Sequence, residues 1–125
     1  MFANYPIYPS LPATDLERAE GFYADKLGLT PESELAGGLF YRCGKDSRFS
    51  VFTSQGKASG THTQAMWLVE DVESEVTALK ARGVVFEEYD VPSLSTVNSI
   101  ATIGTAKGAW FKDSEGNLLS LAQFV

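Results

Sequence analysis

One histidine and one cysteine are the first candidates for chemistry in this chain of 125 residues. His62 can act as a general base or a metal ligand, since imidazole serves both roles in proteins. It equally fits a solvated linker residue, because no acidic partner accompanies it in the sequence. Cys43 can act as a nucleophile, but free cysteines are usually buried and inert, and we expect that here.

Clusters of charged residues offer a second kind of chemistry. Glu87, Glu88 and Asp90 can form a cation site or the rim of a pocket, although such a run more commonly forms a solvated surface. Arg42 and Arg48 flank a turn, and a guanidinium group pairs well with a carboxylate or phosphate. We expect both clusters at the surface of the protein.

The composition indicates a globular protein without affinity for nucleic acid. The hydrophobic share of 44% and charged share of 21% are ordinary for a soluble domain. The net charge is −6 and the basic residues are scattered, so no surface is predicted to neutralise phosphates. The N-terminus does not resemble a signal peptide, and no apolar run approaches the ~20 residues that cross a bilayer. We therefore expect a cytoplasmic protein with neither a nucleic-acid nor a membrane partner.

Two strand-to-helix transitions divide the chain into similar halves. Asp15 and Asp71 each open a helix and lie 56 positions apart, close to half the chain. A Gly- and Ser-rich stretch separates the halves. The sequence predicts one domain over residues 1–125, with a first module at 1–54 and a second at 62–125.

Each module is predicted to contain a strand, a helix and about three further strands. The first helix begins at Thr14 or Asp15 and ends at Gly28, and the second runs from Asp71 to Gly83. The stretch 89–106 is too long for a simple connection; it can form a lid, pack at a dimer interface or hold a short strand. The strands are expected at 5–11, 30–34, 39–43, 49–53, 63–69, 84–87, 97–103, 108–112 and 118–124.

This arrangement, with its helix-entry and hairpin motifs, is similar to a known group of proteins. The motifs lie at residues 12–19, 22–23, 27–29, 69–72, 79, 83–84 and 110–119. They resemble the vicinal oxygen chelate superfamily, which includes glyoxalase I, extradiol dioxygenases and bleomycin resistance proteins. The resemblance implies an α+β fold, in which two βαβββ modules form a curved mixed sheet around a cleft with the helices on the outer face. It also implies a homodimer.

Enzymes of this superfamily place metal ligands on the first and last strands of each module. The resemblance transfers these positions onto Tyr8, Gln64 and Ser120, with Ser50 or Phe52 as the fourth. Divalent transition metals prefer imidazole, thiolate or carboxylate ligands. We therefore expect no metal and no cofactor, which argues against a lactoylglutathione lyase or a dioxygenase. No catalytic residue is assigned.

The alternation of side chains along a strand predicts the rest of the cleft wall. If Tyr8 and Gln64 face the cleft, Ser10 and Met66 do so as well. Ligand contacts are expected at Tyr8, Ser10, Gln64, Met66 and Ser120, with Trp110 as a stacking partner; Leu68, Leu118 and Ala122 share this face, while Ile7, Leu11, Ala65, Trp67, Val69, Leu119 and Leu121 face the helices.

The predicted function is metal-free binding of a small, partly apolar molecule in the cleft. One alternative is a metal-dependent lyase or dioxygenase that uses His62. Another is a metal-free isomerase or lyase with Tyr8 or His62 as the acid–base group. A third is a module whose cleft is filled by its own side chains and which acts through protein contacts.

Overall fold

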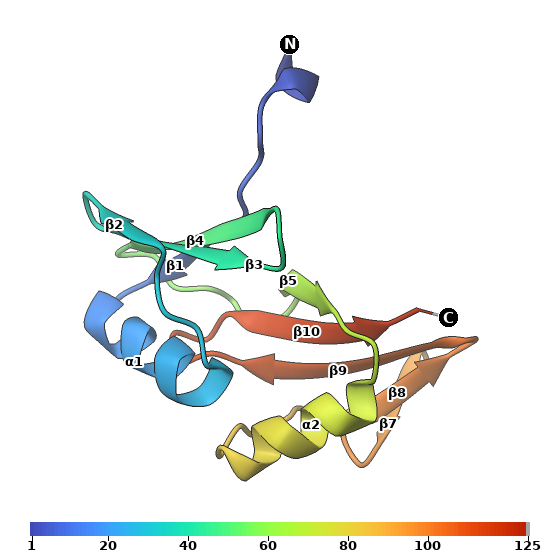
Figure 1. The fold of residues 1–125 in the computed structure, drawn as a ribbon. Helices are drawn as coiled ribbons and strands as arrows, with labels where there is room; N and C mark the ends of the chain where they lie inside the picture. The colour runs from blue at the N-terminus through green and yellow to red at the C-terminus, as the bar shows by residue number, and fades with distance from the viewer. Residues whose placement is uncertain (125) are drawn as a thin grey trace.

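The computed structural model describes residues 1–124, which form two mixed sheets with one helix against each (Figure 1). The strand order is β1-β4-β3-β2 in the first sheet and β5-β10-β9-β8-β7-β6 in the second. The predicted α+β class with curved mixed sheets is confirmed. The elements are η1 (Phe2–Asn4), β1 (Ser10–Ala13), α1 (Leu16–Leu27), β2 (Ser33–Leu35), β3 (Gly38–Cys43), β4 (Ser47–Thr53), β5 (Thr63–Leu68), α2 (Val72–Ala81), β6 (Asp90–Val91), β7 (Leu94–Val97), β8 (Ile100–Ile103), β9 (Ala106–Lys112) and β10 (Leu118–Gln123).

Both helices begin at an aspartate. The Asp15 carboxylate accepts a 3.0 Å hydrogen bond from the Arg18 amide, and the Asp71 carboxylate a 3.3 Å bond from the Ser74 amide. Each satisfies one of the free N–H groups of a first helical turn. The N-cap of α1 is thus Asp15 and not Thr14. Neither helix within residues 1–124 is long and apolar enough to cross a membrane.

The predicted alternation separates a core face from an outer face in both sheets. Leu11, Val51 and Leu119 belong to the buried core between sheets and helices. Trp67 packs against the same core, whereas its neighbour Met66 is 51% exposed. A strand places successive side chains on opposite faces, so this contrast fixes the register of β5.

The first predicted strand is too long at its N-terminal end. The sheet begins at Ser10, and its first hydrogen bond runs from the Ser50 amide to the Pro9 carbonyl at 2.9 Å. Proline has no N–H to donate, so Pro6 and Pro9 interrupt the ladder that the strand would need. Residues 1–8 extend away from the sheet (Figure 1), and Ile7 is exposed rather than packed on a helix.

Residues 84–106 also differ from the prediction. The expected strand at 84–87 is reduced to a single bridge between Phe86 and Phe111. For the stretch 89–106 the alternative of a short strand is confirmed and extended, because it adds β6, β7 and β8 to the second sheet. Its tight turn places Asn98 and Ser99 at positive φ, and Glu88 accepts hydrogen bonds from the Ser99 amide and hydroxyl at 3.1 and 2.8 Å.

Candidate functional site

Three predicted ligand contacts form a row across the outer face of the second sheet. Ser120 on β10 is paired with Met66 on β5 and with Trp110 on β9. Leu119 and Leu121, the neighbours of Ser120, point into the core, so the row lies on the face away from the helices. Ser120 is only 4% exposed, while Met66 is half-exposed. We call Met66, Ser120 and Trp110 the second row.

Gln64 lies two residues before Met66 on β5 and carries an unpaired polar atom. Its Oε1 is buried and accepts no hydrogen bond from any of residues 1–124. The pairing of β5 with β10 shifts register between Leu118 and Leu119, so the ladder is irregular beside it. A buried acceptor without a donor costs about 1–3 kcal/mol. A bound molecule would satisfy this amide once the side chains that cover it move aside.

A corresponding row on the first sheet is closed by its own hydrogen bond. Ser50 on β4 is paired with Ser10 on β1 and with Phe40 on β3. The hydroxyl oxygens of Ser10 and Ser50 share a hydrogen bond of 2.8 Å. We call Ser10, Ser50 and Phe40 the first row. Its polar side chains already have a partner in the chain.

The remaining chemical candidates lie outside both rows. Tyr8 precedes β1 and is 39% exposed. His62 precedes β5 and is exposed, and its Nδ1 lies 3.4 Å from the Ser59 hydroxyl, as expected for a solvated linker residue. Cys43, predicted to be buried, is only half-buried at the end of β3. The structure thus groups Met66, Ser120 and Trp110, leaves Gln64 without a pairing partner at the register shift of β5, and places Ser10 and Tyr8 elsewhere.

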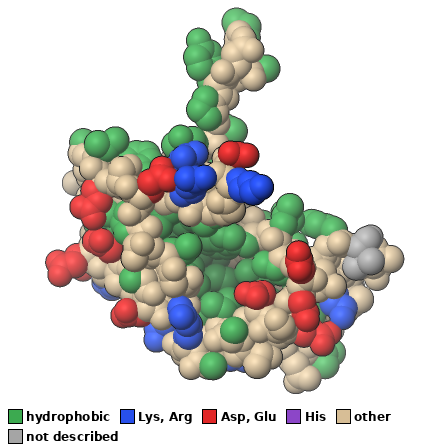
Figure 2. All heavy atoms as spheres, in the orientation of Figure 1, with side chains coloured by type: hydrophobic (Ala, Val, Ile, Leu, Met, Phe, Trp, Pro, Cys, Tyr) green, Lys and Arg blue, Asp and Glu red, His purple; other side chains and the backbone are tan. Residues whose placement is uncertain are grey.

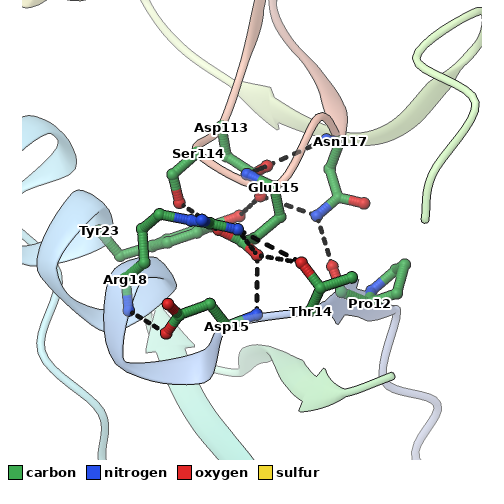
Figure 3. Close-up of polar contacts among 9 residues, drawn as sticks. All are labelled: Pro12, Thr14, Asp15, Arg18, Tyr23, Asp113, Ser114, Glu115 and Asn117. Carbon is green, nitrogen blue, oxygen red and sulfur yellow. Dashed lines mark hydrogen bonds and ion pairs between the residues drawn. The ribbon is translucent and has the colours of Figure 1, made fainter. Parts of the chain in front are cut away.

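A buried carboxylate joins the second half of the chain to the first helix (Figure 3). Glu115, in the turn between β9 and β10, accepts bonds from the Arg18 Nε and Nη2 at 2.7 and 2.9 Å and from the Asp15 amide at 3.1 Å. The Ser114 hydroxyl donates a fourth at 2.9 Å. The hydrogen bonds from Arg18 hold the pKa of Glu115 down at about 2.

Asp113 organises the same turn from the core side (Figure 3). It accepts bonds from the Tyr23 hydroxyl at 2.7 Å, the Asn117 side chain at 2.8 Å, and the amides of Glu115 and Asn117 at 2.8 and 3.0 Å. Asn117 also donates to the Pro12 carbonyl at 3.0 Å. Burial raises the pKa of Tyr23 far above its ordinary value. Both carboxylates accept several hydrogen bonds from other residues of the chain, so this cluster stabilises the contact between the turn and α1.

Two cavities lie away from the predicted contacts. One, of about 340 Å³, lies between the two halves on the helix side of the sheets, and one of about 570 Å³ lies between α2 and strands β7, β8 and β9. None of the six predicted ligand contacts lines either cavity. Sequence reasoning missed both because their walls come from residues distant in the chain, many of which follow the ordinary pattern of a core.

Solved structures share this arrangement, although no protein-family model and no curated protein matches the chain. A glyoxalase/bleomycin resistance protein/dioxygenase from Nocardioides is 20% identical, with a TM-score of 0.66 over 97% of this chain and 85% of that one. Lactoylglutathione lyase from Agrobacterium tumefaciens is 21% identical, with a TM-score of 0.66 over 95% and 92%. The fosfomycin resistance protein FosX from Listeria monocytogenes is 14% identical, with a TM-score of 0.70 over 97% and 93%.

The chain has the glyoxalase/bleomycin resistance/dioxygenase fold. The resemblance to the vicinal oxygen chelate superfamily is thereby confirmed at the level of the fold. At these identities the likeness concerns architecture, and it does not carry a reaction from any of these proteins to this chain.

The residues at the metal positions of this fold do not suit a metal. Tyr8 lies outside the first strand, and the other positions offer the amide of Gln64 and the hydroxyls of Ser50 and Ser120. Within residues 1–124, no three His, Cys, Asp or Glu side chains lie together as a metal-binding group would. Neutral amides and hydroxyls bind transition metals weakly, so these residues are poor ligands for such a metal.

Proposed function

We propose that the protein binds a small, partly apolar molecule, without a metal, on the outer face of the second sheet. The observation that carries the proposal is the buried and unpaired Oε1 of Gln64 beside the second row. An apolar surface with a few placed polar groups is typical of sites that hold small organic molecules.

Some of these side chains would bind the ligand through apolar contacts, and one would bind it through a hydrogen bond. Trp110 supplies an aromatic surface, and its Nε1 donates to the Thr63 hydroxyl at 3.1 Å, which fixes the orientation of the indole ring. Met66 supplies an adaptable thioether next to Ser120. Gln64 Oε1 accepts a hydrogen bond from the ligand. The ligand therefore carries an N–H or O–H group on an apolar body.

Binding is favoured over catalysis because each acid–base candidate is misplaced or lacks a carboxylate partner. Tyr8 lies outside the first strand, and His62, although next to the Thr63 that Trp110 contacts, has the Ser59 hydroxyl rather than a carboxylate as its partner. Similar folds named as a fosfomycin resistance protein and a lactoylglutathione lyase support a small molecule, rather than a macromolecule, as the partner.

Indole and 1-methylindole test the proposal, since they have nearly the same apolar body and only indole donates an N–H. The probes are titrated into ¹⁵N-labelled protein in EDTA, and the two tryptophan side-chain signals are assigned with W67F and W110F. We expect indole to shift the Trp110 signal saturably and 1-methylindole to bind at least about tenfold more weakly, the effect of losing ~1.4 kcal/mol.

Two variants separate the proposed site from the rest of the protein. Gln64→Leu should remove the preference for indole, while Ser10→Ala in the first row should leave it unchanged. Equal binding of the two probes by the unaltered protein, or binding that disappears in EDTA, would contradict the proposal.

A further inference from the structure

The cavity between the two halves is lined almost entirely by apolar side chains. It lies on the helix side of the sheets and has a volume of about 340 Å³. Figure 2 shows it as a hollow with a hydrophobic floor in the middle of one face of the protein. Its apolar wall consists of Leu27, Leu29, Cys43, Trp67, Val69, Leu79, Phe111 and Leu121.

These wall residues are core side chains that the fold leaves incompletely covered. Leu27, Trp67 and Leu79 pack against the buried core and yet remain partly exposed. Each helix covers the sheet of its own half, and the Lys26 ammonium donates to the Arg82 carbonyl at 2.9 Å, which joins the two helix ends. Apolar surface that stays in contact with water loses the stabilisation of burial, and a bound apolar molecule restores it.

The reason for the cavity is the length of one turn. The turn between β9 and β10 spans residues 113–117 and reaches the start of α1 through Glu115. The corresponding turn between β3 and β4 spans only residues 44–46. Gly44 of that shorter turn and Glu75 in the first turns of α2 both line the cavity. The space that the long turn fills in one half thus stays open in the other.

Two side chains of opposite charge complete the lining. Arg42 donates from Nε to the Lys45 carbonyl at 3.0 Å, and its Nη1 lies 3.9 Å from the Glu32 carboxylate, which leaves further N–H groups available. Glu75 makes no ion pair with any of residues 1–124. In Figure 2 basic side chains gather above the hollow, and acidic side chains lie on both sides of it. The lining therefore offers a hydrogen-bond donor and an acceptor with no net charge.

We propose that this cavity is a second ligand site, which takes an uncharged fused-ring aromatic molecule with one hydroxyl or amide group. A dry apolar cavity of about 150 Å³ holds a single benzene ring, so a volume about twice as large suits two fused rings. A hydroxyl or amide both accepts and donates, which matches Arg42 and Glu75. The site is independent of the proposed function, because Trp67 and Trp110 lie on opposite faces of the second sheet.

Titration with 2-naphthol, followed through the two tryptophan side-chain signals of the ¹⁵N-labelled protein, tests the proposal. We expect a saturable shift of the Trp67 signal and little change at Trp110. 2-Methoxynaphthalene, which can accept from Arg42 but has no proton to donate to Glu75, should bind at least about tenfold more weakly. A shift of Trp110 alone would overturn this inference while supporting binding at the second row.

Variants at Cys43 locate the bound molecule. Cys43→Phe fills the cavity and should weaken binding of 2-naphthol at least about tenfold, whereas Cys43→Ser keeps the space and should bind like the unaltered protein. Unchanged binding to Cys43→Phe would overturn the inference.

A second measurement needs no variant to fold. Cys43 is the only cysteine of the chain, so its alkylation by iodoacetamide reports on the cavity wall directly. Saturating 2-naphthol should slow alkylation about tenfold or more, and an unchanged rate would overturn the site. A Trp67 shift that follows protein concentration without any ligand would show that a second copy fills the cavity, which also contradicts the inference.

Discussion

The outer rows of the two sheets contain corresponding residues and differ in how their polar groups are paired. Phe40 and Trp110 lie 70 positions apart, and so do Ser50 and Ser120. In each sheet the serine is paired with the aromatic residue across neighbouring antiparallel strands. The repeat therefore reaches beyond the helix-entry motifs into the faces that are available for binding.

The difference arises on the parallel edge strands. In the first sheet β1 supplies Ser10, whose hydroxyl pairs with Ser50 at 2.8 Å. In the second sheet β5 supplies Met66, which cannot pair with Ser120 in the same way, and Gln64, whose Oε1 has no partner within residues 1–124. The first row is paired internally, whereas a buried acceptor next to the second row has no donor. This difference is the basis for proposing a ligand at the second sheet and not at the first.

The junction between the halves shows a second asymmetry, with larger consequences for stability. The start of α1 receives the Glu115 carboxylate from the other half of the chain. The start of α2 instead receives Gln123 from the adjacent strand β10, which accepts a 2.9 Å bond from the Val72 amide. The cavity with Glu75 lies near α2. The contacts of Glu115 thus stabilise the start of α1, whereas the cavity that we propose as a ligand site lies near the start of α2.

The largest expected change in stability comes from removing the contact between Glu115 and the start of α1. Glu115→Gln removes a carboxylate whose side chain is 1% exposed and leaves Arg18 without its partner. We expect a loss of about 1–2 kcal/mol in the free energy of unfolding, because Glu115 is buried but the Arg18 side chain is 53% exposed and can turn to water. Urea unfolding measures it. Glu75→Gln, near the start of α2, is the matched control. A comparable loss of stability in that variant would contradict the difference between the starts of the two helices.

The dependence of stability on pH should follow the same carboxylate. The pKa of Glu115 lies at about 2, below its ordinary value of 4.5, so its stabilising contribution is complete above pH 4.5 and is lost as the pH falls toward 2. One such group gives a slope of at most about 1.4 kcal/mol per pH unit in this window. Urea unfolding midpoints measured between pH 2 and pH 6 should depend less steeply on pH in Glu115→Gln than in the unaltered protein. The same pH dependence in both proteins would exclude Glu115 as its source.

Much of the fold could be predicted from local patterns. The caps at Asp15 and Asp71 and the glycine at the end of α1 act within one helical turn, and alternation along β4, β5 and β10 separated core from outer face. Alternation placed Met66 and Ser120 on one face because the register of a half-buried strand is strongly specified, whereas Trp110 was only a candidate for stacking.

The failures involve interactions that local patterns do not encode. The prolines at 6 and 9 removed Tyr8 from the sheet, and a turn with Asn98 and Ser99 at positive φ divides the strand predicted at 97–103, where no glycine signalled a turn. Glu115 meets Arg18 across 97 positions of the chain. The cavity remains open because the turn at 44–46 is too short to fill it. This could not be predicted from local patterns, since it depends on how the two halves pack together.

Opposite changes in stability should distinguish the two rows. Ser10→Ala removes the partner of the Ser50 hydroxyl and should cost about 1 kcal/mol. Gln64→Leu removes an acceptor that is buried without a partner, so it should raise the free energy of unfolding by about 1 kcal/mol while impairing ligand binding. Thermal unfolding of both variants checks the signs. A destabilised Gln64→Leu would mean that this amide is satisfied, and the distinction between the rows would be lost.

The smallest expected effect concerns the glycines beneath the two aromatic rings. A Cβ at Gly38 would lie 3.2 Å from the Phe40 ring, and a Cβ at Gly108 would lie 3.1 Å from the Trp110 ring. Each ring must move by a few tenths of an ångström to admit a methyl group, so Gly38→Ala and Gly108→Ala should change stability similarly and by less than about 1 kcal/mol. Only Gly108→Ala displaces a ring that we assign to ligand binding, so it alone should weaken indole binding, by about threefold or ~0.6 kcal/mol. Equal loss of binding in both variants would mean that the first row also contacts the ligand, and the two faces would then act as one site.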